Sequence, residues 1–515
     1  MKLNLVQNTK RNVVAGSINQ VFQLLFPFLN RTLFLWLLGP EYLGLNGLFA
    51  SVLGVLRLTE LGFGPAVGRS MFKLVARDDR EEICACLRFY RTLYHGVGIV
   101  IFAIGLCLLP FIRNIIHGTV PQGINIHVLY LIHLINTAVG YFFFAYRGSI
   151  LTVHHRGDVI TNINTSISIV QYITVALILI FTRSYYFYVI ATVFFSVISN
   201  LLVFFATRRL FPDIEPHGKP KRALRHRILL DARSAFMHKI GGTVVNTVDN
   251  IVISSFLGLA AIAIYGNYNF IQLSVAGFVG IMESSIRAGI GNRIYTDTRE
   301  NNFLLFIKLL RLSMIGTVWS IAMMIALYQP FMRIWTKDDS SLMCHMLTPL
   351  LITCSFLVIQ ARQMLLLFKN TAGIWHQDRW KPLIAACLNL GLNITFVKTF
   401  PESYKLDGVI LSTIIAITLV EAPWEVYIMF TRFFNAAQAR VYLKQQAGFV
   451  LFAVLLSAVT WYGANAIPFE GMLGLVMKGC VAAIISGSIS LAIFRSDIKI
   501  AIESVLNKNK EALFQ

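Results

Sequence analysis

The sequence predicts an all-α polytopic membrane protein, and three observations support this fold class. Of the 515 residues, 56% are hydrophobic and only 14% are charged, whereas soluble domains carry about 25% charged residues. The mean hydropathy is +0.66. Apolar runs of about 18 to 26 residues recur along the chain, and about 20 residues cross a ~30 Å hydrocarbon core as a helix.

These runs predict about 14 transmembrane helices. The first run is too long for the core of a signal peptide and lacks an A-x-A cleavage site, so we expect it to be retained. The approximate spans are 13–38, 43–67, 89–112, 125–146, 159–181, 185–205, 236–257, 262–286, 304–327, 342–368, 382–398, 406–430, 447–466 and 471–494.

The net charge of +20 is distributed unevenly. Most Lys and Arg residues fall in alternate loops, a pattern that places both termini in the cytoplasm. The longest basic loop, "RRLFPDIEPHGKPKRALRHR" from Arg208 to Arg227, is expected to be solvated near anionic lipid headgroups. It has few aromatic residues for stacking on bases, so we expect no nucleic-acid partner.

The sequence contains no clear motif for catalysis or metal binding. The seven cysteines form no C-x-x-C pair and no zinc-type spacing, so we expect free thiols and no metal site. The glycine-containing stretch "GFGPAVG" does not match G-x-G-x-x-G and follows a membrane helix rather than a strand. We expect no enzyme, no catalytic residues and no cofactor, and energy from an H⁺ or Na⁺ gradient or from the substrate's own gradient.

An internal repeat relates the first two spans to the seventh and eighth. "NRTLFLWLLGPEYLGLNGLF" from Asn30 aligns without a gap with "DNIVISSFLGLAAIAIYGNY" from Asp249, which pairs Gly39 with Gly258. After an insertion of four residues, Glu60 pairs with Glu283. An even number of spans separates the copies, so we expect two parallel six-helix repeats around a central cavity, with two additional C-terminal helices.

This repeat predicts the domain organisation. The N-terminal six-helix half is residues 1–207, a basic cytoplasmic linker is 208–235, and the C-terminal six-helix half is 236–433. The extra helix pair is 434–494. Residues 495–515 have the pattern of an interfacial amphipathic helix, and we expect them to form a cytoplasmic tail.

Charged residues occur inside the predicted spans. A charge at the bilayer centre costs about 2.5 to 3.5 kcal/mol, so such residues are expected to be paired, to line water or to function. Arg57 and Glu60 are spaced i,i+3, and Glu283 and Arg287 are spaced i,i+4, so each pair shares a helix face. A structural ion pair competes with a functional role for Arg57, and snorkelling to the helix end competes for Arg287.

Two glutamates on the twelfth span form a like-charge pair. Glu421 and Glu425 are spaced i,i+4, so one is expected to be protonated or matched by a cation, which makes a proton or sodium role a candidate. Lys478, near the start of the last span, is best explained by snorkelling. On the first span a polar stripe contains Asn30, and on the seventh a polar stripe contains Asp249 or Asn250. Together the two stripes predict a cavity lined by both halves.

Three stretches carry a family resemblance. "ELGFG" at the second span, "AYRGSILTVHHRGDVI" after the fourth and "NTVDNIVISSFLG" in the seventh resemble the polysaccharide transporter family of the multidrug/oligosaccharidyl-lipid/polysaccharide exporter superfamily. The resemblance implies a flippase in the bacterial inner membrane. It would move undecaprenyl-diphosphate-linked oligosaccharide units by alternating access, for O-antigen (lipopolysaccharide), capsule or related polysaccharide synthesis. Membrane lipids, a glycan polymerase and glycosyltransferases are the implied partners.

The resemblance also implies roles for individual residues. Cationic side chains in the cavity of such transporters meet the diphosphate or acidic sugars, and Arg31 and Arg57 fit this role best, with Arg362 a weaker candidate. The candidate substrate-binding residues are Arg31, Arg57, Arg362, Asn30 and Asn250. The candidates for gating or ion coupling are Glu60, Asp249, Glu283, Arg287, Glu421 and Glu425.

Two other transport functions compete with this prediction. A lipid II flippase belongs to the same superfamily and is poorly separated by sequence. A cation-coupled multidrug exporter usually has twelve spans, so the two extra helices and the arginines argue against it. A membrane-bound glycosyltransferase or polymerase would have a large outer loop or a soluble domain, and neither is predicted.

Overall fold

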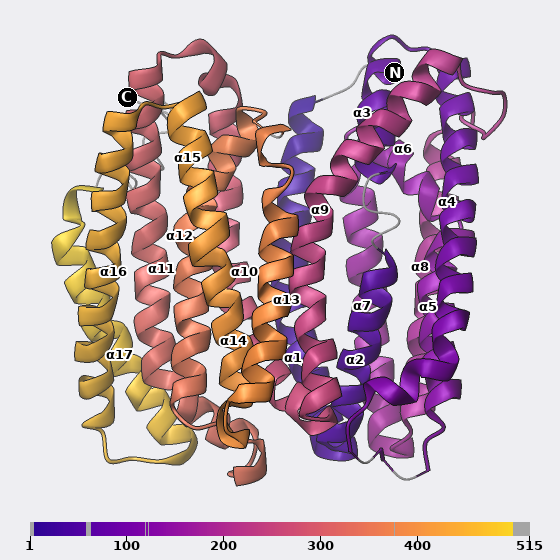
Figure 1. Ribbon diagram of the computed structural model, residues 1–515. Helices are drawn as coiled ribbons and strands as arrows, with labels where there is room; N and C mark the ends of the chain where they lie inside the picture. Colours follow the sequence, from indigo (N-terminus) through magenta and orange to yellow (C-terminus); the bar gives the residue numbers. More distant parts are fainter. Residues whose placement is uncertain (1–4, 58–62, 119, 122, 375, 498–515) are drawn as a thin grey trace. The chain divides into compact units, whose positions relative to one another are not determined.

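The computed structural model describes residues 5–57, 63–118, 120–121, 123–374 and 376–497. Its regular elements there are all helices (Figure 1). The protein is thus an all-α polytopic membrane protein, as predicted. Within the described residues, nine helices are long and apolar enough to cross a membrane, or ten if one bent pair counts as a single span. Each predicted span overlaps one helix or consecutive helices, and the number fourteen stays a prediction.

The chain forms two compact units, residues 1–263 and 264–515. In unit 1, α7 packs on α1 and α8, and α9 packs on α2 and α3. The boundary between the units falls inside α10, whose first residues belong to unit 1. The helices of unit 1 are α1 (Leu5–Leu38), α2 (Pro40–Leu56), α3 (Phe63–Ala76), α4 (Arg80–Leu108), η2 (Leu109–Ile115), α5 (Ile126–Phe142), η3 (Ala145–Arg147), α6 (Gly148–Val153), α7 (Gly157–Thr182), α8 (Tyr185–Leu210), α9 (Arg222–Phe256) and the start of α10 (Leu259–Thr296).

Unit 2 contains the rest of α10 and the helices that follow. The long helix α11 packs on α12, α16 and α17, while α14 packs on α12 and α13. The domain boundaries expected from the repeat stay a prediction. The remaining elements are α11 (Arg299–Trp335), η4 (Ser340–Leu342), α12 (Leu347–Thr371), η5 (His376–Asp378), α13 (Lys381–Thr399), η6 (Glu402–Tyr404), α14 (Lys405–Ala416), the π-helix η7 (Ile417–Glu421), α15 (Ala422–Arg432), α16 (Ala436–Asn465) and α17 (Gly471–Ile493).

Two glycines that the repeat pairs occupy matching places in the structure. Gly39 separates α1 from α2 with φ 104°, and Gly258 separates α9 from α10 with φ 89°. Side chains with a Cβ rarely adopt this backbone conformation, so glycine is favoured at both positions. Shared geometry at an aligned pair supports the repeat alignment.

The segment expected to be a solvated basic loop is held against α4 and η3. The Lys221 backbone N–H donates to Glu82 Oε1 at 2.9 Å, and the buried Arg147 is 2.6 Å from Glu215 Oε2. Helix α9 begins at Arg222, so the second half of the predicted linker is helical. The loop from 211 to 221 is therefore fixed against α4 and η3, although its lysines, such as Lys219, are exposed.

Candidate functional site

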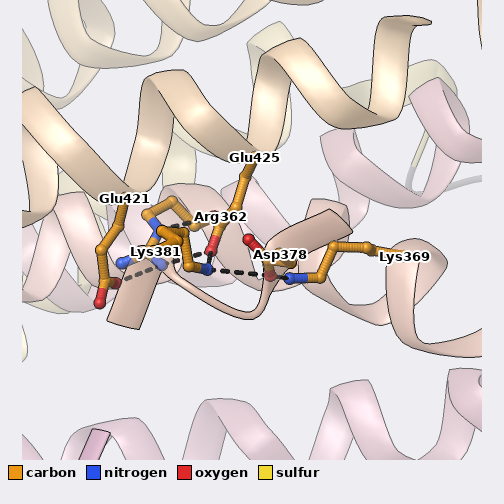
Figure 2. Close-up of polar contacts among 6 residues, drawn as sticks. All are labelled: Arg362, Lys369, Asp378, Lys381, Glu421 and Glu425. Atoms are coloured by element: carbon orange, nitrogen blue, oxygen red, sulfur yellow. Dashed lines mark hydrogen bonds and ion pairs between the residues drawn. The ribbon is translucent and has the colours of Figure 1, made fainter. Parts of the chain in front are cut away.

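Six charged side chains meet inside unit 2, and we call them the charge network (Figure 2). Five of the six are at most 9% exposed, and Glu421 is 17% exposed. They come from helices far apart in sequence that pack together. The members are Arg362 and Lys369 on α12, Asp378 on η5, Lys381 on α13, Glu421 on η7 and Glu425 on α15.

Arg362 contacts both glutamates of the network. Its Nε donates to Glu425 Oε2 at 2.8 Å and its Nη2 to Glu425 Oε1 at 2.6 Å. The same Nη2 is 2.5 Å from Glu421 Oε2. A planar guanidinium matches a carboxylate through two parallel bonds, so this contact fixes orientation as well as charge. Helix α12 is thereby joined to both η7 and α15.

The two lysines extend the network to the connection between α12 and α13. Lys381 forms ion pairs with Glu425 Oε1 and with Asp378 Oδ2, the latter at 3.3 Å. Lys369 forms an ion pair with Asp378. Three cationic and three anionic side chains therefore neutralise one another, which is the condition under which charges can be buried together.

A proline explains the local structure that carries the two glutamates. Pro423 has no N–H, and its ring conflicts with the carbonyl of Leu419, so a regular α-helical bond cannot form there. The chain forms the π-helix η7 over Ile417–Glu421 before α15 begins at Ala422. Single π turns are rare and occur often at functional sites. Here the π turn ends at the network residue Glu421.

The structure resolves the alternative posed by the like-charge pair. Glu421 and Glu425 are matched by a cation, and that cation is the guanidinium of Arg362, with Lys381 added at Glu425. Three of the predicted candidates are thus brought together in unit 2. Their roles in substrate binding and ion coupling stay predictions.

Sequence reasoning missed the other three members. Lys369, Asp378 and Lys381 lie at the ends of spans, where charges are usually solvated. The i,i+3 spacing of Asp378 and Lys381 was a usable signal, because opposite charges at that spacing form pairs. Nothing in the sequence indicated that Lys369 and Lys381 would both reach one aspartate.

The candidates on α1 contact the backbone of neighbouring helices in unit 1. Asn30 is 7% exposed and its Nδ2 donates to the Tyr172 carbonyl at 3.3 Å, which joins α1 to α7. Arg31 Nη2 donates to the Ala263 carbonyl at 3.4 Å. Both side chains therefore contribute to packing in unit 1.

On α9, Asn250 Nδ2 donates to Ser51 Oγ of α2 at 2.9 Å, and Asp249 is 6% exposed. The Arg57 side chain is exposed at the end of α2, where Arg57 is the C-cap. Glu60 lies outside the described residues. So do the side chains of Glu283 and Arg287 on α10, and the proposed pairs of these residues are untested.

Comparison with known proteins shows the family. A model described as "Polysaccharide biosynthesis protein" matches residues 9–285, more than half of the chain. The chain belongs to this polysaccharide biosynthesis family, as its resemblance predicted. Curated protein sequences give no match.

Solved structures show the same fold. The lipid II flippase MurJ, in an inward closed conformation, aligns with a TM-score of 0.68 and 16% identity, over 95% of this chain and 99% of that one. An inward-facing multidrug resistance MATE transporter of the MOP superfamily aligns with a TM-score of 0.59 and 15% identity, over 81% and 98%. A MOP superfamily transporter from Pyrococcus furiosus aligns with a TM-score of 0.51 and 16% identity, over 82% and 96%. The protein therefore has a transporter fold.

Proposed function

We propose that the protein is a flippase that moves undecaprenyl-diphosphate-linked oligosaccharide units across the bacterial inner membrane by alternating access. These oligosaccharides would be used for the synthesis of O-antigen, capsule or a related polysaccharide. The family match carries this proposal, because it connects the chain with polysaccharide biosynthesis while the fold is that of transporters. A glycan assembled on a lipid at one membrane face and polymerised at the other must cross the bilayer between these steps.

Unit 1 offers cationic groups for the diphosphate. The Arg57 side chain is exposed at the C-terminal end of α2, and its guanidinium can bind phosphate oxygens through parallel hydrogen bonds. Arg31, Asn30 and Asn250 lie on the neighbouring helices α1 and α9. Their packing contacts would hold those helices in place during binding.

The charge network supports a role in gating within unit 2. Under the cytoplasmic orientation of the termini, the network lies in the half of α12 that leads to the cytoplasm, and its Glu425 lies in the first turn of α15. Glu421 is its most exposed carboxylate, and it shares Arg362 with Glu425. Protonation of Glu421 would remove one of the two carboxylate charges on Arg362 and so loosen η7 from α12. Such a step would couple the network to an H⁺ gradient, with Na⁺ as the alternative coupling ion.

A lipid II flippase is the second candidate. MurJ aligns over 95% of this chain, whereas the MATE transporter aligns over 81%. The greater coverage favours a lipid-linked substrate over a small cationic drug, but it does not separate lipid II from other lipid-linked glycans. Partner enzymes would be glycosyltransferases on the cytoplasmic side and a glycan polymerase on the periplasmic side.

Proteoliposomes with the purified protein test the function directly. Three cargoes are compared in separate vesicles: an undecaprenyl-diphosphate-linked oligosaccharide, lipid II and a cationic dye. We expect the first to become accessible to an external glycan-modifying enzyme faster than in protein-free vesicles. Faster translocation of lipid II alone would assign the second candidate, and transport of the dye alone would contradict both flippase functions.

A further inference from the structure

A cavity with both polar and apolar lining lies in unit 2, apart from the charge network. It is formed where α11 and α16 end and α17 begins, and its volume is about 590 Å³. We call it the α17 pocket. This volume is within the range of about 300 to 1,000 Å³ that is typical of small-molecule sites. Neither the family nor the proposed transport function assigns it a ligand.

Close helix packing shapes the pocket. Ala326 of α11, Ala464 of α16 and Ala482 of α17 form a small buried cluster, and small side chains let helix backbones approach closely. One wall is fixed by Gln329, whose Nε2 donates to the Cys344 carbonyl at 2.7 Å and whose Oε1 accepts from Tyr268 at 3.2 Å. The cavity is therefore bounded mainly by the packed helices α11, α16 and α17.

The pocket contains charges of both signs. Arg333 and Lys478 are its cations, and Asp338 and Glu470 are its anions. Arg333 and Glu470 are 3.9 Å apart, and both are more than half exposed, so this ion pair is weak. Among the described residues, Lys478 has no hydrogen-bond or ion-pair partner. It lies about 10 Å along α17 from Gly471, at 1.5 Å per residue.

The surface around the pocket is apolar, as expected where helices meet lipid. Exposed apolar side chains cover α16 and α17 beside it, including Val459, Tyr462 and Val476. Trp461 lines the pocket, and indole rings favour the boundary between hydrocarbon and water. Snorkelling would explain Lys478 alone, but it does not explain a cavity of this volume with two carboxylates in its lining.

We propose that the α17 pocket binds the headgroup of a zwitterionic phospholipid. The phosphate would contact the Lys478 ammonium and the Arg333 guanidinium, while the lipid ammonium would contact Glu470 and Asp338. The acyl chains would lie along the apolar surfaces of α16 and α17. An equal number of cations and anions favours this ligand over an anionic lipid, which has no cation for the carboxylates. Binding of this lipid would be independent of the transport substrate.

Native mass spectrometry of the purified full-length protein tests the proposal. Phosphatidylethanolamine is titrated into wild type, Lys478→Gln and the control Lys444→Gln, whose exposed lysine lies on α16 outside the pocket. We expect Lys478→Gln to lower affinity for the lipid about tenfold, as for the loss of one charge-assisted bond (1.4 kcal/mol per tenfold). The control should bind like wild type. Equal affinity of all three proteins would overturn the proposal.

Lipid selectivity separates headgroup binding from a structural effect of the lysine. The double variant Asp338→Asn with Glu470→Gln removes both anions, so phosphatidylglycerol should bind more tightly and the preference for phosphatidylethanolamine should disappear. Weaker binding of both lipids by the double variant would indicate that the substitutions disturb the pocket itself, and it would contradict the charge assignment. Inorganic phosphate in excess should not displace the lipid. Displacement by it would identify a site for free phosphate instead.

Discussion

Glu425 is the carboxylate on which the charge network depends most. It is fully buried and contacts both Arg362 and Lys381. We predict that Glu425→Gln lowers the free energy of unfolding by about 3 kcal/mol, because removal of one partner leaves buried cations incompletely neutralised. Thermal unfolding of the purified protein measures this change.

Glu421→Gln is the matched control for that experiment. Glu421 is 17% exposed, and without its charge Arg362 still keeps both hydrogen bonds to Glu425. We expect a loss of about 1 kcal/mol, in the range of a single partly solvated interaction. Equal losses for the two variants would show that the network does not depend on the buried carboxylate.

Arg57 carries the sharpest prediction for unit 1. Its side chain is exposed, so Arg57→Ala should leave the amount of protein in the membrane unchanged. If its guanidinium meets the diphosphate, the same variant should abolish surface glycan, measured by glycan staining of cells that depend on the variant. Arg432→Ala, which removes an exposed arginine at the end of α15, should keep surface glycan. Normal glycan with Arg57→Ala would exclude this residue from the site.

At the scale of single residues, the sequence predicted that Glu421 and Glu425 needed a partner, but it did not predict which residue that partner is. The spacing of Glu421 and Glu425 indicated uncompensated charge. Arg362 lies some sixty positions away in sequence, and its contact with them arises only when α12 packs against α15. Local spacing reports neighbours on one helix face, whereas pairing between helices depends on tertiary packing.

Helix α2 depends on a glycine at its closest contact. A Cβ at Gly44 would lie 2.0 Å from the Leu259 carbonyl oxygen at the start of α10. Backbone atoms cannot rotate away as a flexible side chain can, so Gly44→Ala should force α2 and α10 apart. We predict a loss of about 1 to 3 kcal/mol in unfolding free energy, the usual cost of overpacking.

The control substitution for this contact should not lower the free energy of unfolding. Gly448 on α16 has no atom within 4 Å of the position its Cβ would take. Alanine favours a helix interior over glycine by about 1 kcal/mol, so Gly448→Ala should leave stability unchanged or raise it. A similar loss in both variants would show that the loss at Gly44 does not come from the contact with Leu259.

The repeat predicted a feature of the connections between helices that apolar runs do not. It paired Gly39 with Gly258, and both separate two helices at positive φ. Apolar runs predicted spans at 13–38, 43–67, 236–257 and 262–286, but a run alone does not show which backbone conformation separates two helices. The glycine that recurs at aligned positions does indicate it, because a turn with positive φ favours glycine in both copies.

For the whole molecule, composition was enough to predict the fold class, because a membrane protein must bury its backbone polar groups in helices or closed barrels. Which face of the membrane each loop occupies depends instead on the distribution of Lys and Arg. The two ends of α12 offer a direct test, because this helix of 25 residues is long enough to separate them by a bilayer.

Single cysteines placed at the exposed residues Ser340 and Arg379 report the two sides. Ser340 precedes α12 and Arg379 follows it. If both termini are cytoplasmic, a membrane-impermeant maleimide should label Ser340→Cys in intact cells and Arg379→Cys only after permeabilisation, each above the labelling of wild type. The reverse pattern would invert the orientation and move the charge network to the periplasmic side. In that case, Glu421 could take up protons only from the periplasm, and the proposed gate would open toward the opposite leaflet.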